Sequence, residues 1–582
     1  MQTENKSTEL KNFECKSDCK VIDGVSYCAI EIAGEFSGWH TEISQMHMLL
    51  RFYREIDGRT EQRLYPFFVQ CTSEKSRLSV RGSVDVRTEY ILSDFKVHHP
   101  ESPFRVALLY VNQEMQWREQ VLEAEIPVEW LEHHMKKESV LHSVGRKVTY
   151  GLCTLFLPIW LLSGALAVKG IGKLRPSAKG MSGKKAMLYH AHDMVKGWTG
   201  YGYSVREYKT NYFKRWYERF RKKVTQTSGV LFLSERAVDD GGNLDRVRKA
   251  LKKENTLEIT EFLTTRPVHK LTGKELKECA ALAARARVIV LEDFFPQLHA
   301  LSVRNDTEIL QMWHACGAFK LFGLSELGKT SLSQDTRNHR SYTAALTSSE
   351  GIAPFYSEAF GIDINCIKPV GVPRTDVFFD RKYREETIEE LYKRYPEWQN
   401  KKIILFAPTF RGSGNKTAYY PMEKFPINEV MDRLPKDVVL IVKQHPFVKS
   451  DIIVEDCYKS RVFDLNGKEN INDLLFVTDL LVTDYSSTVF EAALLDIPML
   501  FYTFDLEEYL SERDLYFDFS AFAPGAIIRE FDELLSEINR NLGHEQKVSV
   551  DEKFREFFLG ALDGNSTERT VELIHNLYDG KD

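Results

Sequence analysis

Three small hydroxyl side chains stand together where a predicted strand meets a predicted helix. Residues 479–483 form a short, mostly apolar run, Asp484 follows it, and Ser486, Ser487 and Thr488 precede a helical pattern. Free backbone N–H groups at a helix N-terminus attract anions, and hydroxyl groups add donors to a phosphate. A single serine or threonine also caps a helix without binding anything. Three in succession favour phosphate binding, and plain capping is the alternative.

Two other predicted strands end in groups that suit a phosphate. Arg411 and a glycine-rich turn follow the run 402–408, and Lys443 and His445 follow the run 438–442. Each group has an ordinary alternative, as a surface cation or as a loop histidine with satisfied hydrogen bonds. Because ligands of parallel sheets bind at the carboxyl ends of the strands, three such ends together predict a pocket for a pyrophosphate.

A histidine in an earlier part of the chain could act as a base. His314 follows Trp313, precedes a turn at Gly317 and belongs to a segment that ends at Lys320. Imidazole titrates near neutral pH, so a histidine in the same cleft can take a proton from a hydroxyl group. The alternative is a structural histidine at a bend.

The elements that position these residues alternate between strand and helix from about residue 229. Apolar runs at 229–235 and 286–294 begin one series, and a second series extends from 402 to 504. Such alternation predicts parallel sheets covered on both faces, and two series predict two sheets with a cleft between them. Residues 550–578 are predicted to form closing helices. No GxGxxG motif follows the first strand of either series, so a nicotinamide cofactor is not expected.

The N-terminal part of the chain has a different pattern. Between residues 20 and 130, short apolar runs are separated by turn-like stretches, which predicts a small, sandwich-like β-rich domain. A chain of 582 residues is too long for one core, and 43% hydrophobic with 28% charged residues is typical of a globular protein. The net charge of −6 argues against nucleic-acid binding. Cys15 and Cys19 are the one close pair among nine cysteines, and without further ligands no metal is predicted.

Two segments indicate contact with a membrane. Residues 148–168 carry no charge and are long enough to span a bilayer, but Pro158 interrupts them and both flanks are basic. A hairpin dipping into the inner leaflet is favoured over a single span or a buried core helix. Residues 203–223 mix basic and aromatic side chains, which suits an anionic lipid surface. The alternative there is a solvated helix whose aromatic face packs on its own domain.

These patterns divide the chain into four predicted units. Residues 1–135 are a β-rich accessory domain, and 136–228 are a membrane-associating hairpin and basic helix. Residues 229–372 and 373–582 are two Rossmann-type domains, of which the second carries the closing helices.

The motifs, taken in order, resemble those of the CDP-glycerol/CDP-ribitol polyolphosphotransferases of wall teichoic acid synthesis in Gram-positive bacteria. They are Trp313-His314 followed by Gly and Lys, GVPRTD (371–376), APTFR (407–411), KQHP (443–446), TDYSS (483–487) and the segment with Asp505 and Tyr509. The resemblance covers roughly residues 229–580 and is only loose before that. It is strongest to the poly(ribitol-phosphate) polymerase branch, because glycerol-type members more often carry glycine where this chain has Ala315.

The resemblance implies a GT-B fold and transfer of a polyol phosphate from CDP-ribitol or CDP-glycerol, with release of CMP. The acceptor would be a teichoic acid chain on a polyprenyl diphosphate, at the cytoplasmic face of the membrane. His314 would be the base, with Arg411 and His445 as further catalytic groups and without a metal or cofactor. The predicted substrate-binding residues are Lys320, Arg374, Lys443, Asp484, Ser486, Ser487, Thr488, Glu491, Asp505 and Tyr509.

Two other functions remain open from the sequence. One is a GT-B glycosyltransferase that uses a nucleotide sugar, which would share both sheets and the phosphate site. The other is a non-catalytic membrane scaffold with a degenerate transferase domain. The intact set of His314, Arg411 and His445 argues against the scaffold.

Overall fold

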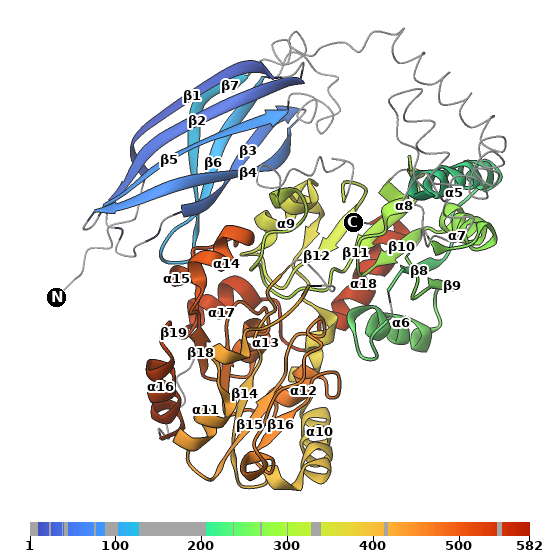
Figure 1. Ribbon diagram of the computed structural model, residues 1–582. Helices are drawn as coiled ribbons and strands as arrows, with labels where there is room; N and C mark the ends of the chain where they lie inside the picture. Colours follow the sequence, from blue (N-terminus) through green and yellow to red (C-terminus); the bar gives the residue numbers. More distant parts are fainter. Residues whose placement is uncertain are drawn as a thin grey trace, which may run out of the picture.

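The chain folds into an antiparallel β-sheet unit and two α/β units (Figure 1). The computed structural model describes residues 10–22, 25–37, 39, 43, 45–56, 58–74, 77–87, 103–126, 205–236, 238–267, 270–299, 301–326, 339–412, 417–543 and 550–581. The uncharged segment 148–168 lies outside these residues, as does most of the predicted unit 136–228.

The N-terminal unit is one seven-stranded antiparallel sheet in the order β1-β2-β5-β4-β3-β6-β7. Its strands are β1 (Leu10–Ile22), β2 (Val25–Ser37), β3 (Gln45–Ile56), β4 (Arg59–Glu74), β5 (Arg77–Arg87), β6 (Phe104–Val111) and β7 (Trp117–Ile126). The prediction of β structure is confirmed, but the sandwich-like type is wrong. Long strands twist strongly, so a single sheet curls around its own apolar face, with Phe36, Phe52 and Phe67 fully buried inside.

The first α/β unit has a six-stranded parallel sheet in the order β13-β12-β11-β10-β8-β9. The strands are β8 (Val230–Ser234), β9 (Ile259–Leu263), β10 (Val288–Leu291), β11 (Glu308–Gln311), β12 (Ala344–Leu346) and β13 (Ile367–Lys368). Its helices include α6 (Asn243–Glu254), α7 (Gly273–Arg285), α8 (Pro296–His299) and α9 (Ala353–Phe360). The strand order reverses between β8 and β10, so this is the switch point at which ligands of such sheets bind.

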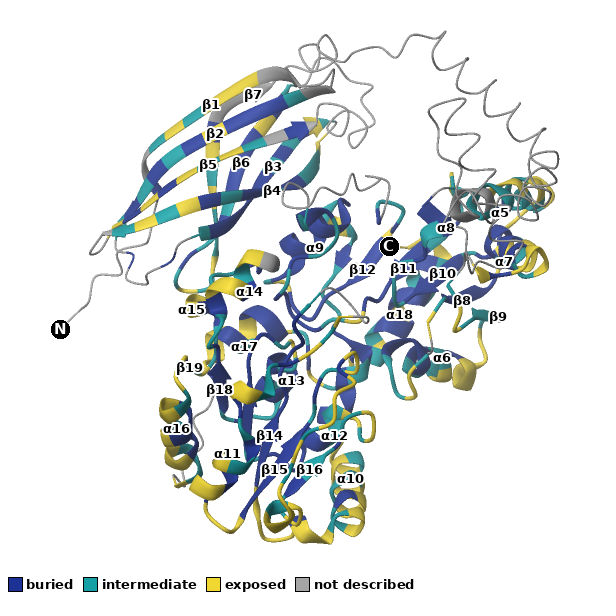
Figure 2. Ribbon diagram, in the orientation of Figure 1, coloured by how far each residue is buried: buried dark blue, intermediate teal, exposed yellow. Residues whose placement is uncertain are grey.

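The second α/β unit has a six-stranded parallel sheet in the order β16-β15-β14-β17-β18-β19, which is the doubly wound order. The strands are β14 (Lys402–Phe406), β15 (Val438–Val442), β16 (Val462–Asp464), β17 (Leu480–Thr483), β18 (Met499–Tyr502) and β19 (Ala526–Ile528). Its helices are α11 (Ile427–Arg433), α12 (Ile471–Leu475), α13 (Val489–Leu494), α14 (Leu506–Glu512), α15 (Phe519–Phe522) and α16 (Phe531–Gly543). Its switch point lies between β14 and β17. Figure 2 shows the central strands of both parallel sheets buried, whereas the edge strand β9 is half-buried.

The connecting and closing helices tie the two α/β units together. The 3₁₀-helix η5 (Pro373–Phe378) and α10 (Arg381–Arg394) lead into the second unit, and α17 (Glu552–Leu559) and α18 (Ser566–Asp579) follow it. The last helix returns to the first unit, where it packs on α6, β10 and β11. Asp376 holds its N-terminus by accepting hydrogen bonds from the backbone N–H groups of Ser566 (3.0 Å) and Thr567 (2.8 Å). The predicted closing helices are therefore present, and α18 packs on the other sheet.

The β-sheet unit is docked on the α/β units through buried polar contacts. His47 Nε2 on β3 lies 3.0 Å from Glu358 Oε2 on α9, and both side chains are almost fully buried. Trp117 Nε1 donates to the carbonyl oxygen of Gly351 at 2.7 Å. Because unpaired polar groups are costly when buried, these contacts fix the orientation of the sheet.

The basic aromatic segment forms α5 (Val205–Arg221), which packs on α7 and α8. Phe213 and Tyr217 are buried in the core of the first α/β unit, and Trp216 stacks on Phe220 with ring centroids 5.6 Å apart. Packing on its own domain, the alternative left open by the sequence, therefore accounts for much of the aromatic pattern. Among the described residues, no helix is both long enough and apolar enough to cross a bilayer.

We expect Glu358→Ala to destabilise the docked β-sheet unit by about 2–4 kcal/mol, because it leaves His47 buried without its partner. Calorimetric melting and limited proteolysis of the purified protein would measure this. Glu350→Ala, which removes an exposed carboxylate nearby, is the matched control. Equal melting curves for the two variants would contradict the proposed docking role.

Candidate active site

Arg411 is the buried centre of the switch point in the second sheet. Its Nε and Nη2 atoms donate to Asp505 at 2.6 and 2.9 Å, and Nη1 donates to Asp484 at 2.9 Å and to the carbonyl oxygen of Thr409 at 3.1 Å. Burial disfavours the charge of this side chain, but Asp484 and Asp505 outweigh burial and raise the pKa of Arg411. The guanidinium therefore joins the loops after β14, β17 and β18.

Asp484 and Tyr509 complete the wall around Arg411. Asp484 also accepts hydrogen bonds from the backbone N–H groups of Thr409 (2.7 Å) and Tyr485 (2.6 Å). The rings of Tyr485 and Tyr509 stack at 3.9 Å, and the Arg411 guanidinium lies 5.1 Å from the centroid of each. These contacts show how Asp484 and Asp505 hold Arg411; direct substrate contacts by these residues stay a prediction.

Two further cations and an imidazole gather beside this wall. Lys320 Nζ lies 3.4 Å from Thr409 Oγ1 and 5.6 Å from the centroid of the Tyr509 ring. The Arg513 guanidinium lies 4.4 Å over the ring of Phe410, and the His445 ring packs on the same phenylalanine with centroids 4.6 Å apart. Arg513 also donates to the carbonyl oxygen of Gly412 at 2.9 Å. None of the three forms an ion pair with a carboxylate of the described residues.

The electrostatics of this group, which we call the cation cluster (Lys320, His445 and Arg513), favour an anion. Burial lowers the pKa of Lys320 to about 8, with Arg513 and Arg411 adding to the effect and Asp484 opposing it. Burial, Lys320 and Arg513 lower the pKa of His445 to about 4. Protonation of Lys320 and of His445 is therefore disfavoured by burial and by the neighbouring cations, and an anion placed among these groups would oppose that effect. A diphosphate supplies the needed charge.

The other predicted phosphate groups lie at nearby strand ends, with partners of their own. Lys443 Nζ donates to the carbonyl oxygen of Leu465 at 2.8 Å, and burial lowers the pKa of Lys443. Ser486 Oγ donates to Thr488 Oγ1 at 3.1 Å, while Ser487 is exposed. The helix that follows, α13, has only six residues and no side-chain cap. Phosphate binding by these groups stays a prediction.

His314 lies at the ends of β8, β10 and β11, next to the switch point of the first sheet. Trp313 before it has a φ of 55°, a left-handed conformation that costs a non-glycine residue about 1–3 kcal/mol. Two buried hydrogen bonds hold it there, from Trp313 N to Gln311 Oε1 and from Asn243 Nδ2 to Trp313 O, both 2.9 Å. Backbone strain that several contacts hold in place is characteristic of functional sites. Here the strained backbone of Trp313 sets the position of the His314 imidazole.

Charged groups on three strand ends surround the His314 ring. One edge is open to solvent, and the ring hydrogen-bonds to the backbone carbonyl of Glu292. The pKa of His314 is lowered mainly by burial of the rest of the ring, and the positive charges of Arg236 and Arg374 lower it further. The negative charge of Asp293 opposes this lowering. The Glu292 carboxyl has a pKa raised to about 7 by burial and Asp239, although backbone N–H groups at the start of α6 oppose the rise. A neutral imidazole is therefore maintained near neutral pH.

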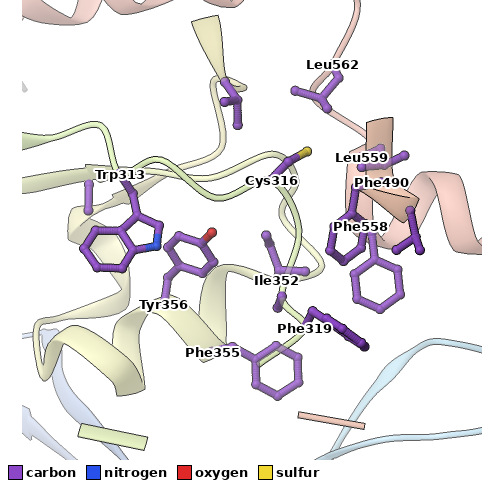
Figure 3. Close-up of a cluster of buried hydrophobic side chains, with 14 of the residues drawn as sticks. Trp313, Cys316, Phe319, Ile352, Phe355, Tyr356, Phe490, Phe558, Leu559 and Leu562 are labelled. Carbon is purple, nitrogen blue, oxygen red and sulfur yellow. The ribbon is translucent and has the colours of Figure 1, made fainter. Parts of the chain in front are cut away.

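A single loop, residues 313–321, connects His314 to the cation cluster. Gly317 has a φ of 68°, and a Cβ atom there would lie 2.3 Å from the Phe490 ring, so only glycine fits. Beyond it, Phe319 O accepts from Tyr516 N at 2.9 Å and Leu321 N donates to Asp514 O at 3.0 Å. Figure 3 shows Trp313, Cys316 and Phe319 on this loop and Phe490 of α13 in the same apolar cluster. The loop thus starts at one sheet and delivers Lys320 to the other.

Arg374 and Glu491 form a second link between the units. Arg374 Nη2 donates to Glu491 Oε1 at 2.5 Å, and Arg374 Nε donates to the carbonyl oxygen of His314 at 3.4 Å. Glu491 is buried, which excludes the interpretation of this residue as a helix-surface charge. These two residues support the His314 loop from the side of α13.

Sequence reasoning missed Arg513 and Glu292. Arg513 follows α14 in a segment without periodicity, and only its place near Tyr509 in the chain pointed to the site. Glu292 directly follows β10, so its position at a strand end was the available signal. Among the described residues, no group of His, Cys, Asp and Glu side chains is placed to hold a metal ion.

A family model described as CDP-glycerol:poly(glycerophosphate) glycerophosphotransferase matches residues 216–576, more than half of the chain. The chain is 37% identical over 374 residues to a teichoic acid poly(ribitol-phosphate) polymerase of Bacillus spizizenii, covering 64% of this chain and 60% of the relative. It is 38% identical over 356 residues to the teichoic acid ribitol-phosphate polymerase TarL of Staphylococcus aureus, covering 60% of this chain and 62% of the relative. The matches therefore span less than two thirds of these relatives.

The fold is also similar to that of a solved wall teichoic acid polymerase, TagF. The TM-score is 0.52 at 18% identity, over 64% of this chain and 94% of that chain. At this identity the likeness shows the fold alone, which confirms a mixed α/β architecture with parallel sheets.

We expect the affinity for inorganic pyrophosphate to fall as the pH rises above about 8. The pKa of Lys320 is about 8 in the free protein, and a bound anion would raise it, so binding takes up protons in this range. The loss would reach up to about tenfold per pH unit. Calorimetric titration at several pH values measures it.

Lys320→Arg is the matched control, because arginine stays protonated throughout this pH range. In that variant, only the protonation of pyrophosphate itself would still make the affinity depend on pH. Identical pH dependence in the wild type and the variant would exclude Lys320 from the site.

Proposed function

The chain belongs to the CDP-glycerol:poly(glycerophosphate) glycerophosphotransferase family, and we propose that it transfers ribitol phosphate from CDP-ribitol to a teichoic acid acceptor. The acceptor is a lipid-linked chain with a terminal hydroxyl group, and the released product is CMP. The observation that carries the proposal is the single loop that begins with His314 at one switch point and ends with Lys320 in the cation cluster at the other.

The reaction follows from the chemistry of these groups. The acceptor hydroxyl attacks the β-phosphorus of the donor, its proton passes to the free ring nitrogen of His314, and the bond from phosphorus to the bridging oxygen breaks. CMP leaves with the electrons of that bond. Lys320 and Arg513 offset the charge that develops on the diphosphate, and the neutral His445, whose Nδ1 accepts from Phe447 N at 3.2 Å, donates a hydrogen bond from Nε2. Phosphoryl transfer needs alignment and charge compensation above all, and a low His314 pKa keeps the base ready.

We propose supporting roles for the remaining predicted site residues. Arg411 acts from behind the cation cluster, where Asp484, Asp505 and Tyr509 hold it in place. Lys443, Ser486, Ser487 and Thr488 bind phosphate oxygens at the strand ends. Arg374 and Glu491 keep the His314 loop beside α13. The two sheets work as a GT-B pair, with 229–372 on the acceptor side and 373–582 on the donor side.

Ribitol is the polyol that the relatives favour. Two similar proteins are named as ribitol-phosphate polymerases, and this chain carries Ala315 where glycerol-type members more often have glycine. Glycerol phosphate, the group in the family description, is the second candidate.

We also propose that the protein works at the inner face of the cytoplasmic membrane, where a lipid-linked acceptor lies. Residues 136–228 would hold it there, with 148–168 dipping into the leaflet. Exposed Lys214, Arg215 and Arg219 on α5 would face anionic lipid. Residues 1–135 form the accessory domain of this assignment.

We expect His314→Ala to lower turnover by at least about a hundredfold while donor binding survives, because the variant removes only the base. CMP release from CDP-ribitol with a lipid-linked acceptor analogue measures turnover, and calorimetry measures donor binding. His575→Ala, at a half-buried histidine paired with Glu254, is the matched control.

Retained turnover in purified His314→Ala would exclude His314 as the base. The same assay separates the alternatives: UDP release from a UDP-sugar would identify a glycosyltransferase. The absence of any thermal shift with CDP-ribitol, CDP-glycerol or UDP-sugars would favour a non-catalytic scaffold.

The acid limb of the pH–rate profile should lie below pH 6.5, since the pKa of His314 is lowered from its usual 6.5 by burial and nearby cations. Arg236→Ala removes one cation and releases Asp293 from an ion pair of 2.6 Å, and both effects raise the His314 pKa. We expect the limb to move up by a few tenths to about one unit. Arg236→Lys keeps the charge and should leave it in place. If the acid limb of the pH–rate profile did not move in Arg236→Ala, a group other than His314 would be responsible for it.

A further inference from the structure

Asn243, the first residue of α6, has a buried side chain whose hydrogen bonds reach two other segments of the chain. The residue is 0% exposed, and the capping position of α6 belongs to Gly242, which offers no side-chain cap. Asparagine is a poor helix former whose side chain is favoured at caps and turns. Its place inside α6 therefore needs a reason outside the helix.

The amide of Asn243 joins two backbone segments that meet beside the first switch point. Its Nδ2 atom donates to the carbonyl oxygen of Trp313 at 2.9 Å, and its Oδ1 atom accepts from the backbone N–H of Arg374 at 2.8 Å. Trp313 directly precedes His314, and Arg374 belongs to η5, which leads into the second α/β unit. Both functions of the amide, donor and acceptor, are therefore used.

Arg374 returns to the same loop through its side chain. Its Nε atom donates to the carbonyl oxygen of His314 at 3.4 Å, next along the backbone from the carbonyl that Asn243 binds. Because Asn243 also holds the backbone N–H of Arg374, these contacts form a closed ring. The contact between Arg374 and His314 therefore depends on Asn243.

A further connection passes through Glu292. The backbone N–H groups of Asn243 and Leu244 donate to the Glu292 carboxyl group. The backbone carbonyl of Glu292 in turn accepts the hydrogen bond from the His314 ring. Asn243 is thus connected to the imidazole as well as to the backbone that carries it.

The strained backbone of Trp313 makes this support necessary. Its φ of 55° costs free energy of the same order as the loss of one buried hydrogen bond. Without the Asn243 amide, Gln311 would still bind the N–H of Trp313, but the carbonyl oxygen would lose its hydrogen bond. The strained conformation would then no longer be favoured, and His314 would turn with the relaxing backbone.

We propose that Asn243 is the positioning residue of His314, which sets the orientation of the imidazole at the first switch point. It acts through Trp313, Arg374 and Glu292 and does not itself touch a substrate. The chemical role of His314 rests on the proposed function, whereas the dependence of its position on Asn243 rests on these contacts.

Two variants of Asn243 test the proposal, and melting curves show that each one folds. Asn243→Asp keeps the acceptor for the backbone N–H of Arg374 and places an oxygen against the carbonyl oxygen of Trp313. Asn243→Leu removes both hydrogen bonds and adds no charge. Asn112→Asp is the matched control, because Asn112 is also buried and keeps the acceptor for two backbone N–H groups of its own turn.

Nuclear magnetic resonance of the histidine-labelled, full-length protein reports on His314 without any substrate. The His314 signal is assigned from its absence in His314→Ala, and its titration gives the pKa. Burial is the largest cause that lowers this pKa, so an imidazole released from its position should titrate closer to the ordinary 6.5. We expect this rise in both Asn243 variants and not in Asn112→Asp. A wild-type His314 titration in a folded Asn243 variant would overturn the proposal.

The CMP-release assay measures the effect on turnover. We expect kcat to fall about ten- to a hundredfold in Asn243→Asp, since a small misplacement of a reacting group costs this much. The KM for CDP-ribitol should change by less than about twofold, because Asn243 lies in the other α/β unit from the cation cluster. The calorimetric stoichiometry of donor binding gives the fraction of native protein.

Two outcomes of this assay would contradict the positioning role. One is a wild-type kcat in Asn243→Asp, and the other is a stoichiometry that falls in parallel with kcat, as a merely structural role requires. If the wild type itself releases no CMP, the proposed function fails. The titration of His314 then still decides whether Asn243 sets the position of the ring.

Discussion

The buried guanidinium of Arg411 is the constraint on which the geometry of the second switch point depends. Its bonds to Asp484 and Asp505 join the ends of strands that lie far apart in the sequence, and no other side chain could make this planar, forked set. A buried ion pair of this kind contributes little net stability, because desolvation offsets the attraction. The ion pairs instead fix the positions of Thr409, Phe410 and Tyr509. These three residues are contacted by the cation cluster of Lys320, His445 and Arg513.

Much of the architecture could be predicted from the sequence, because parallel strands that are buried on both faces have continuous apolar sequences. The runs at 229–235, 286–294, 402–408, 438–442 and 479–483 each contain a strand of the two sheets. The strands β9, β16 and β19 were missed: β16 and β19 have only three residues each, and β9 is only half-buried. The curled single sheet also escaped prediction, since alternation identifies the two faces of a strand but says nothing about which sheet covers them.

The types of residue in the candidate site could be predicted from the sequence, but the contacts between these residues were harder to predict. His314, Arg411 and His445 were found because polar groups after apolar runs stand out. The carboxylates around Arg411 come from separate loops, and Arg513 lies in a segment without any periodic signal, so only the fold brings them together. The aromatic pattern of α5 had two interpretations, because a pattern that suits a lipid surface equally suits the interior of a domain, and Phe213 and Tyr217 lie in the core.

The segment around Tyr516 belongs to the second α/β unit and contacts both other units. Its backbone pairs with Phe319 and Leu321 of the His314 loop, its hydroxyl lies 2.8 Å from Ser325 Oγ, and the His47 ring packs against its face at 5.2 Å. Arg513 stands three residues before Tyr516, and Lys320 lies opposite Leu515. Through Tyr516, the N-terminal sheet therefore packs against the segment that borders the cation cluster, although the family match begins only at residue 216.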